Sequence, residues 1–315
     1  MAARTLNEVY SQLSAQRRYE VWFVRLGLAD HSGAWWFRYL LLNPARDRSA
    51  TPSAGMPVQV WATWFGSDTL PHTCIQEFPV QALDLSARDA SPFHFLVAEN
   101  GIDDAGCHGY LNAQGHKIYW DLRVRSSFRV TLSDKGWIGF SRTAHSDGIF
   151  SGRIVLDGRV FEGDPLGFGI QGHNCGYRHR SHWTWAHAFF PREKNPSTLE
   201  SLIYDMPLGL TFWKAVLWHD NHEYVFQRCR KSSFDRQQFR WQFQCERGDA
   251  SLSAVIDGSG PNVHRIAYQK TDGSGTFDVL NNSLARATVH LDRPGLRVDD
   301  LETLTGAVLE SAGKE

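Results

Sequence analysis

The 315-residue sequence has little methionine or cysteine and no excess of either charge. Only three methionines and five cysteines occur, and no two cysteines have the C-x-x-C spacing typical of redox or zinc motifs. The 33 basic and 34 acidic side chains give a formal net charge of -1. This balance excludes a global basic field for nucleic acid and an acidic solvating tail.

Long apolar runs are also missing. No run approaches the roughly 18 residues that a membrane-spanning helix needs. The first 18 residues, MAARTLNEVYSQLSAQRR, lack the apolar segment of a secretory leader. We therefore expect a soluble cytoplasmic protein whose thiols are reduced.

Aromatic residues, in contrast, are abundant: 12 Trp, 19 Phe and 9 Tyr make up 13% of the chain. Together with 27 glycines, this composition favours β-structure. Runs of alternating apolar and polar residues recur between turn signals, and Asp157-Gly158 is a strong hairpin signal between two of them. Because helix-period segments are nearly absent, we predict an all-β fold, either a sandwich or a barrel, and not a βαβ architecture.

Two short helices are expected at the ends of the chain. Residues 5–17 begin with a capping-box pattern and place four apolar residues on one helical face. Residues 300–310 follow two aspartates and repeat Leu301, Leu304 and Val308 at helical spacing. The polar, proline-containing stretch 191–198 suggests a domain boundary, giving an N-terminal domain 1–190 and a C-terminal domain 191–315.

Several motifs could indicate a cofactor or a metal, and each has a simpler explanation. Residues 167–172 (GFGIQG) match G-x-G-x-x-G, but no helical pattern follows, which disfavours a dinucleotide site. His179 and His182 have a spacing that metal ligands can use, yet His182 and His187 fall on opposite faces of a predicted strand. The segment 219–223 (HDNHE) lies where a hairpin must turn. We expect neither a bound metal nor a cofactor.

The predicted strand 182–190 carries large aromatics on one face. Trp183, Trp185 and His187 share that face, whereas the other face has small residues. The predicted strand 210–218 has aromatics on both faces, including Trp213 and Trp218. Two interpretations remain open: these side chains fill a core, or they line a cavity for a hydrophobic ligand, as barrels of about eight strands can.

Three pairs of stretches resemble one known family. They are 19–23 (YEVWF) with 36–39 (WFRY), 151–158 (SGRIVLDG) with 167–169 (GFG), and 172–176 (GHNCG) with 183–186 (WTWA). In this order they resemble the superfamily of carotenoid 1,2-hydratases (hydroxyneurosporene synthases), tocopherol cyclases and related bacterial lipocalin-like proteins. The resemblance implies two lipocalin-like antiparallel barrels in tandem, with apolar pockets. It also implies cofactor-free protonation of an isoprenoid alkene, with aromatic faces stabilising the cation.

The sequence departs from the family pattern, G-Y-x-acid-x-N-W-G, at the position that matters most. Alignment places Gly172 where the resemblance implies the acidic proton donor. His173 could replace the acid beside Asn174 as an orienting residue, or Asp164 or Asp205 could reach in from elsewhere. Alternatively, this type of chemistry is lost or altered. We expect His173 and Asn174 to meet the aromatic strand face at the mouth of the cavity.

These observations predict a protein that binds a hydrophobic small molecule of isoprenoid, carotenoid or polyketide type. Hydratase, cyclase or isomerase activity without a cofactor would take place in the same pocket. The alternatives are a non-catalytic carrier and a structural lipocalin-like protein. No nucleic-acid partner is expected, a transient membrane contact is compatible with the ligand class, and the oligomeric state is open. The residues expected to bind the ligand are Trp183, Trp185, His187, Tyr204, Trp213, Trp218 and Cys175.

Overall fold

The computed structural model describes residues 6–10, 18–42, 57–85, 93–135, 138–192, 195–295 and 298–313. Within them the chain forms two antiparallel sheets and two short 3-10 turns, η2 (Val80–Ala82) and η4 (Pro207–Gly209). The strands of the first sheet are β1 (Tyr19–Leu28), β2 (Gly33–Leu42), β3 (Val58–Gly66), β4 (His72–Phe78), β5 (Leu83–Asp84), β6 (His94–Val97), β7 (Asn100–Asp103), β8 (Gly106–Ala113), β9 (His116–Arg125), β10 (Val130–Asp134), β11 (Gly139–Leu156) and β12 (Arg159–Gly176). The strands of the second sheet are β13 (Trp183–Phe190), β14 (Ser197–Asp205), β15 (Thr211–His219), β16 (His222–Phe226), β17 (Cys229–Asp235), β18 (Arg240–Arg247), β19 (Ala250–Asp257), β20 (His264–Gln269), β21 (Thr276–Asp292) and β22 (Asp299–Ala312).

The first sheet curls into a barrel around an aromatic core. Its main path runs β4-β3-β2-β1-β12-β11-β9-β8-β7-β6-β5, and β10 pairs with β11. The path returns on itself where the backbone N–H of Ile75 on β4 donates to the side-chain amide of Gln114, which follows β8. Trp22, Trp35 and Trp120 fill the interior and are fully buried. Much of the tryptophan content is therefore core.

The second sheet repeats this arrangement. Its main path runs β16-β15-β14-β13-β22-β21-β19-β18-β17, and β20 pairs with β21. Its core contains Trp241, Phe243 and Leu252, each almost completely buried. The all-β fold of two tandem lipocalin-like barrels that we predicted is thus confirmed.

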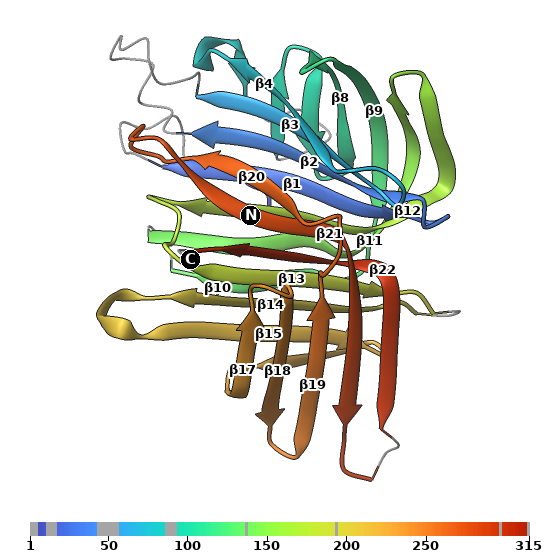
Figure 1. Ribbon diagram of the computed structural model, residues 1–315, viewed down its shortest axis with the longest axis vertical. Helices are drawn as coiled ribbons and strands as arrows, with labels where there is room; N and C mark the ends of the chain where they lie inside the picture. Colours follow the sequence, from blue (N-terminus) through green and yellow to red (C-terminus); the bar gives the residue numbers. More distant parts are fainter. Residues whose placement is uncertain are drawn as a thin grey trace, which may run out of the picture.

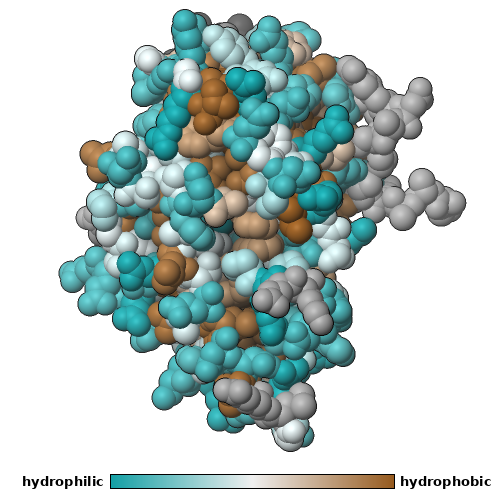
Figure 2. All heavy atoms as spheres, turned by 90° about the vertical axis from the view of Figure 1, so that its right-hand side faces the viewer, coloured by the Kyte–Doolittle hydropathy of each residue, from teal (hydrophilic) through white to brown (hydrophobic). Residues whose placement is uncertain are grey.

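The two barrels pack against each other along strands that are central to both sheets (Figure 1). A third apolar cluster lies between them, with Val21, Phe23 and Trp36 from the first sheet and Trp185 and Val308 from the second among its members. Apolar atoms also show in recesses among the hydrophilic side chains of one face (Figure 2). The barrels are therefore joined by a hydrophobic interface and not only by the chain.

The change from one sheet to the other falls between Gly176 and Trp183. The strand β13 pairs with β14 and β22, so it belongs to the second sheet. The changeover lies before the 190/191 boundary that we expected from the prolines. Those prolines lie instead in the connection between β13 and β14.

The predicted C-terminal helix is wrong. Residues 300–310 lie in β22, where Leu301 and Thr303 are buried and Glu302 and Leu304 are exposed. This alternation has the period of a strand, and the helical spacing of the leucines is incidental. In the predicted N-terminal helix, residues 6–10 form a turn and irregular chain, while residues 5 and 11–17 lie outside the described residues. No helix in the described part of the chain has the length and hydrophobicity to cross a bilayer.

Candidate functional site

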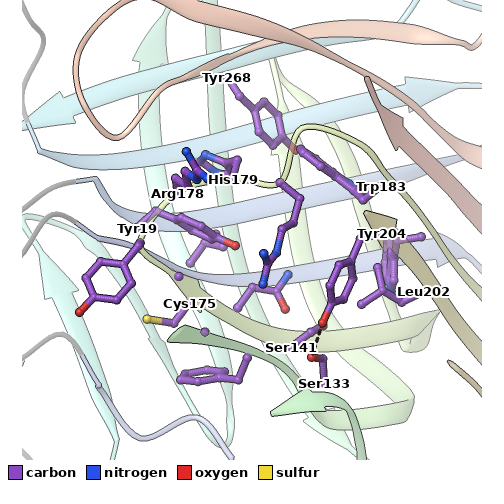
Figure 3. A pocket seen from close by; sticks show the side chains of 18 of the residues that line it. Tyr19, Ser133, Ser141, Cys175, Arg178, His179, Trp183, Leu202, Tyr204 and Tyr268 are labelled. Atoms are coloured by element: carbon purple, nitrogen blue, oxygen red, sulfur yellow. Dashed lines mark hydrogen bonds between the residues drawn. The ribbon is translucent and has the colours of Figure 1, made fainter. Parts of the chain in front are cut away.

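A cavity of about 420 Å³ lies where the two sheets meet. Strands β1, β2 and β12 supply one side, and β13, β14, β20 and β22 supply the other. Figure 3 shows Tyr19, His179, Trp183, Tyr204 and Tyr268 around this space, with the Ser133 and Tyr204 hydroxyls hydrogen-bonded at 3.0 Å. The cavity is large enough for a small organic ligand.

Five residues predicted for the site line this cavity: Asn174, Cys175, Trp183, Trp185 and Tyr204. The end of β12 and the start of β13 bring them together, because the short connection between the two strands passes over the cavity. The predicted meeting of residues 173–176 with the strand face of Trp183, Trp185 and His187 is therefore found only in part, because His173 and His187 do not line the cavity.

His173, predicted as the acid, is not brought to the cavity. Its Nε2 lies 2.8 Å from Glu20 Oε1, and its Nδ1 lies 2.8 Å from the carbonyl oxygen of Leu6. The ring stacks on Trp22 and is fully buried inside the first barrel. Successive residues of a strand point to opposite faces. The unbroken pairing of β12 with β1 places His173 opposite Trp22, inside the first barrel, and Asn174 on the cavity side.

The position that the resemblance assigns to the acid is filled by another side chain. A Cβ atom at Gly172 would lie 2.3 Å from Cζ of Phe23 on the neighbouring strand. The Phe23 ring, which lines the cavity, therefore covers the place of an acidic side chain. A side chain at position 172 would have to displace the Phe23 ring from this place.

Asp164 and Asp205, the other predicted acids, are exposed outside the cavity. Asp164 Oδ1 pairs with Arg125 Nη2 at 2.9 Å. Asp205 Oδ2 pairs with Nδ1 of His182 at 2.9 Å. Neither carboxylate lines the space between the sheets.

Three predicted ligand-binding residues also lie elsewhere. His187 is fully buried, and its Nε2 lies 2.8 Å from the carbonyl oxygen of Ser146. Trp213 belongs to the core of the second barrel. Trp218 stacks on Phe128 at a centroid distance of 4.4 Å. For these three, the geometry agrees with the alternative that the aromatics fill a core.

The carboxyl group of the cavity is one that sequence reasoning missed, Glu310 on β22. Its Oε1 accepts a hydrogen bond from Trp183 Nε1 at 3.0 Å, and its Oε2 accepts one from the Tyr268 hydroxyl at 3.1 Å. Burial raises the pKa of Glu310, which the charge of Arg38 and these hydrogen bonds oppose. The cavity therefore holds an oriented, partly desolvated carboxyl group.

Two basic side chains line the cavity beside this carboxyl group and were also missed: Arg38 on β2, and His179 between β12 and β13. The His179 ring stacks on Tyr19 at a centroid distance of 4.0 Å. Burial and the positive charge of Arg38 lower the pKa of His179 to about 3. At neutral pH the imidazole is uncharged, so Arg38 carries the positive charge of the inner wall.

One group of potential metal ligands occurs in the described residues, His219, Asp220 and Asp299. None of the three lines the cavity: His219 and Asp220 lie at the β15–β16 turn that we predicted for residues 219–223, and Asp299 begins β22. Arg192 donates to Asp220 at 2.9 Å, and Arg293 is hydrogen-bonded to Asp299. Because two guanidinium groups already neutralise the carboxylates, this group has the character of an ion-pair network.

No family model matches the chain, and no curated protein matches it. Among solved structures, kievitone hydratase from Nectria haematococca superposes with a TM-score of 0.56 at 10% identity, covering 98% of this chain and 94% of that one. CghA, solved with Sch210972, gives 0.62 at 11% identity, covering 94% and 88%. A putative AttH from Nitrosomonas europaea gives 0.50 at 11% identity, covering 97% of each chain. At these identities the likeness establishes the fold, which extends over nearly the whole chain.

Proposed function

We propose that the cavity between the barrels binds a hydrophobic small molecule and that Glu310 supports cofactor-free acid–base chemistry on it. The ligand would be of isoprenoid or polyketide type, and the reaction a hydration, cyclisation or isomerisation. The observation that carries this proposal is Glu310, the one carboxyl group that the described residues place in the lining of an aromatic cavity of about 420 Å³. A pocket with an oriented titratable group favours an enzyme over a carrier.

The chemistry follows from the surroundings of Glu310. Because burial raises its pKa, the carboxyl group holds a proton at a higher pH than an exposed glutamate does. In a hydration, the carboxyl group would give that proton to a substrate carbon, and water would add to the neighbouring carbon. The carboxylate would then take one proton from the added water. Trp183 and Tyr268 hold the group in place during both transfers.

Two structural neighbours support this proposal by their names and contents. One is a hydratase, and another was solved with a small organic molecule, Sch210972. The proposed chemistry itself rests on Glu310 of this chain and not on these neighbours.

Ligand binding can be tested with N-phenyl-1-naphthylamine, an uncharged apolar dye that fluoresces when bound. Trp185→Ala should weaken its binding by about 1–3 kcal/mol, because one aromatic wall of the cavity is lost. Trp213→Ala is the matched control, since it removes the same side chain from the core of the second barrel. Equal weakening in both variants, with folding intact by circular dichroism, would contradict binding in the cavity.

The chemical step can be tested once native mass spectrometry has identified a molecule that co-purifies from the host. Incubated in D₂O, the wild-type protein should transfer solvent deuterium to a carbon of that molecule. Glu310→Gln should retain binding and lose the transfer. Exchange should decline as the pH rises above the raised pKa of Glu310, because the acid form is then lost. Retained binding without exchange in the wild type would indicate the carrier instead.

A further inference from the structure

The cavity wall contains a buried arginine, Arg38, which is only 4% exposed. Its guanidinium carbon lies 5.2, 4.6 and 4.1 Å from the ring centres of Trp36, Trp61 and Tyr268. These ring faces attract the positive charge. They accept none of the five N–H groups that point outward in the plane of the guanidinium.

Among the described residues, none accepts a hydrogen bond from Nε or Nη1 of Arg38, and both atoms are shielded from solvent. Another buried arginine, Arg25, shows what a structural role requires. Arg25 donates to the carbonyl oxygens of Gly306 at 3.0 Å and Ala307 at 2.8 Å, and also to those of Ser283 and Thr305. Nε of Arg25 is also buried without a partner, but both its Nη atoms donate to carbonyl oxygens. In Arg38, Nη1 as well as Nε is buried without a protein acceptor, which is costly unless something else supplies one.

No carboxylate of the described residues forms an ion pair with the Arg38 guanidinium. Glu310, the nearby carboxyl group, has its oxygens engaged by Trp183, Tyr268 and Asn281. Arg178, which is exposed, and Arg180, which is half-buried, also line the cavity and add positive charge. The cavity lining therefore combines aromatic side chains with the positive charge of three arginines.

We propose that the ligand carries an acidic oxygen group, a carboxylate or a stabilised enolate, and that Arg38 binds it. This inference rests on the proposed function, since it specifies the ligand of the same cavity. A guanidinium attracts an oxyanion through charge-assisted hydrogen bonds and repels a carbocation. It therefore favours acidic polyketide-type ligands over neutral isoprenoid hydrocarbons.

The test uses two dyes that differ by one anionic group. These are 1-anilinonaphthalene-8-sulfonate and its uncharged analogue N-phenyl-1-naphthylamine. The measured quantity is the ratio of their dissociation constants in each protein. Arg38→Met should reduce the preference for the anionic dye by about tenfold or more, as expected for losing a charge-assisted hydrogen bond. Arg38→Lys should keep part of it, because it keeps the charge.

Arg153→Met is the control, because it removes the same charge from an exposed residue of β11 that pairs with Glu162. It should leave the ratio unchanged. If Arg38→Met does not fold, a crystal structure of the wild-type protein with the sulfonate dye decides instead. The sulfonate should then lie within hydrogen-bond distance of the Arg38 guanidinium.

The two proposals fail in different ways. If the uncharged dye binds in the cavity and Arg38→Met leaves the ratio unchanged, Arg38 is only part of the aromatic stack and this inference is overturned. A sulfonate found only at Arg178 or Arg180 overturns it as well. If neither dye binds in the cavity, the proposed function itself is overturned.

Discussion

Glu200 is a buried carboxyl group whose pKa is raised in the folded protein. It is buried on β14 beside the cavity wall, and its Oε1 accepts hydrogen bonds from Thr143 at 2.9 Å and from Trp185 at 3.2 Å. Its Oε2 is buried with no hydrogen-bond partner. Burial raises the pKa of Glu200 to about 7, although the two hydrogen bonds and the charge of Lys214 oppose this. The carboxyl group thus titrates near neutral pH.

This shift makes stability depend on pH. In the unfolded chain Glu200 has a pKa near 4.5, so between that value and about 7 the folded protein holds a proton that the unfolded chain has released. Stability therefore falls as the pH rises through this window. Glu200→Gln removes the titration, and it should stabilise the protein by roughly 2–3 kcal/mol at pH 8 relative to its effect at pH 4. Urea unfolding at both pH values measures this difference, and an equal effect at both would contradict it.

Site residues close to one another in sequence could be predicted, whereas those joined by strand pairing could not. Asn174 and Trp185 lie near the β12–β13 connection, where glycines and aromatics alternate. Arg38 lies in a strongly apolar strand and Glu310 in a strand of mixed polarity, and nothing local in their sequences shows that these strands face each other across a cavity. The prediction for His173 is wrong because the glycines around it do not fold into a tight loop but lie in a strand that pairs continuously with β1. They permit close backbone approach, as at Gly169, where a Cβ would lie 1.8 Å from the carbonyl oxygen of Arg25.

Hairpins could be predicted from the sequence, whereas the last strand, β22, could not. The turn at Asp157-Gly158 joins β11 to β12, as its sequence predicts, with Leu156 paired to Arg159. β22 combines two signals, because a helical spacing of leucines coincides with the alternating burial of a strand. Its register against β21 shifts between Asn282 and Ala287, where both strands bend. Such irregular pairing weakens the alternation that would identify the strand.

Arg25 stabilises this irregular region. Its guanidinium reaches from β1 to carbonyl oxygens of β21 and β22, and so links the first sheet to the bend of the second. Arg25→Met should lower the free energy of unfolding by about 2–4 kcal/mol, because buried carbonyl groups lose their donor. Arg153→Met, which removes an exposed arginine, should change it by less than about 0.5 kcal/mol. Urea unfolding measures the decrease in the free energy of unfolding for each variant. Similar decreases in both would contradict a stabilising role for Arg25.

The two barrels share an apolar interface, and we expect them to unfold as one unit. The cluster between them contains Phe23 from the first sheet, whose ring meets Trp185 of the second edge-to-face at 5.7 Å. Because each barrel buries apolar side chains against the other, the interface contributes to the stability of both. The cavity lies within the same interface, so a shared folding unit would also hold the site together.

Buried cysteines of the two barrels allow a direct test. Cys107 lies in the core of the first barrel and Cys245 in that of the second, and burial raises the pKa of both thiols. Both should resist alkylation until their barrel unfolds. If the interface couples the barrels, brief alkylation across a urea series, read by mass spectrometry, should give the same midpoint for both cysteines. Phe23→Ala, at a cost of about 3–5 kcal/mol, should lower both midpoints equally. Separate midpoints, or a shift confined to Cys107, would show that the barrels unfold independently and that the cavity opens when either one does.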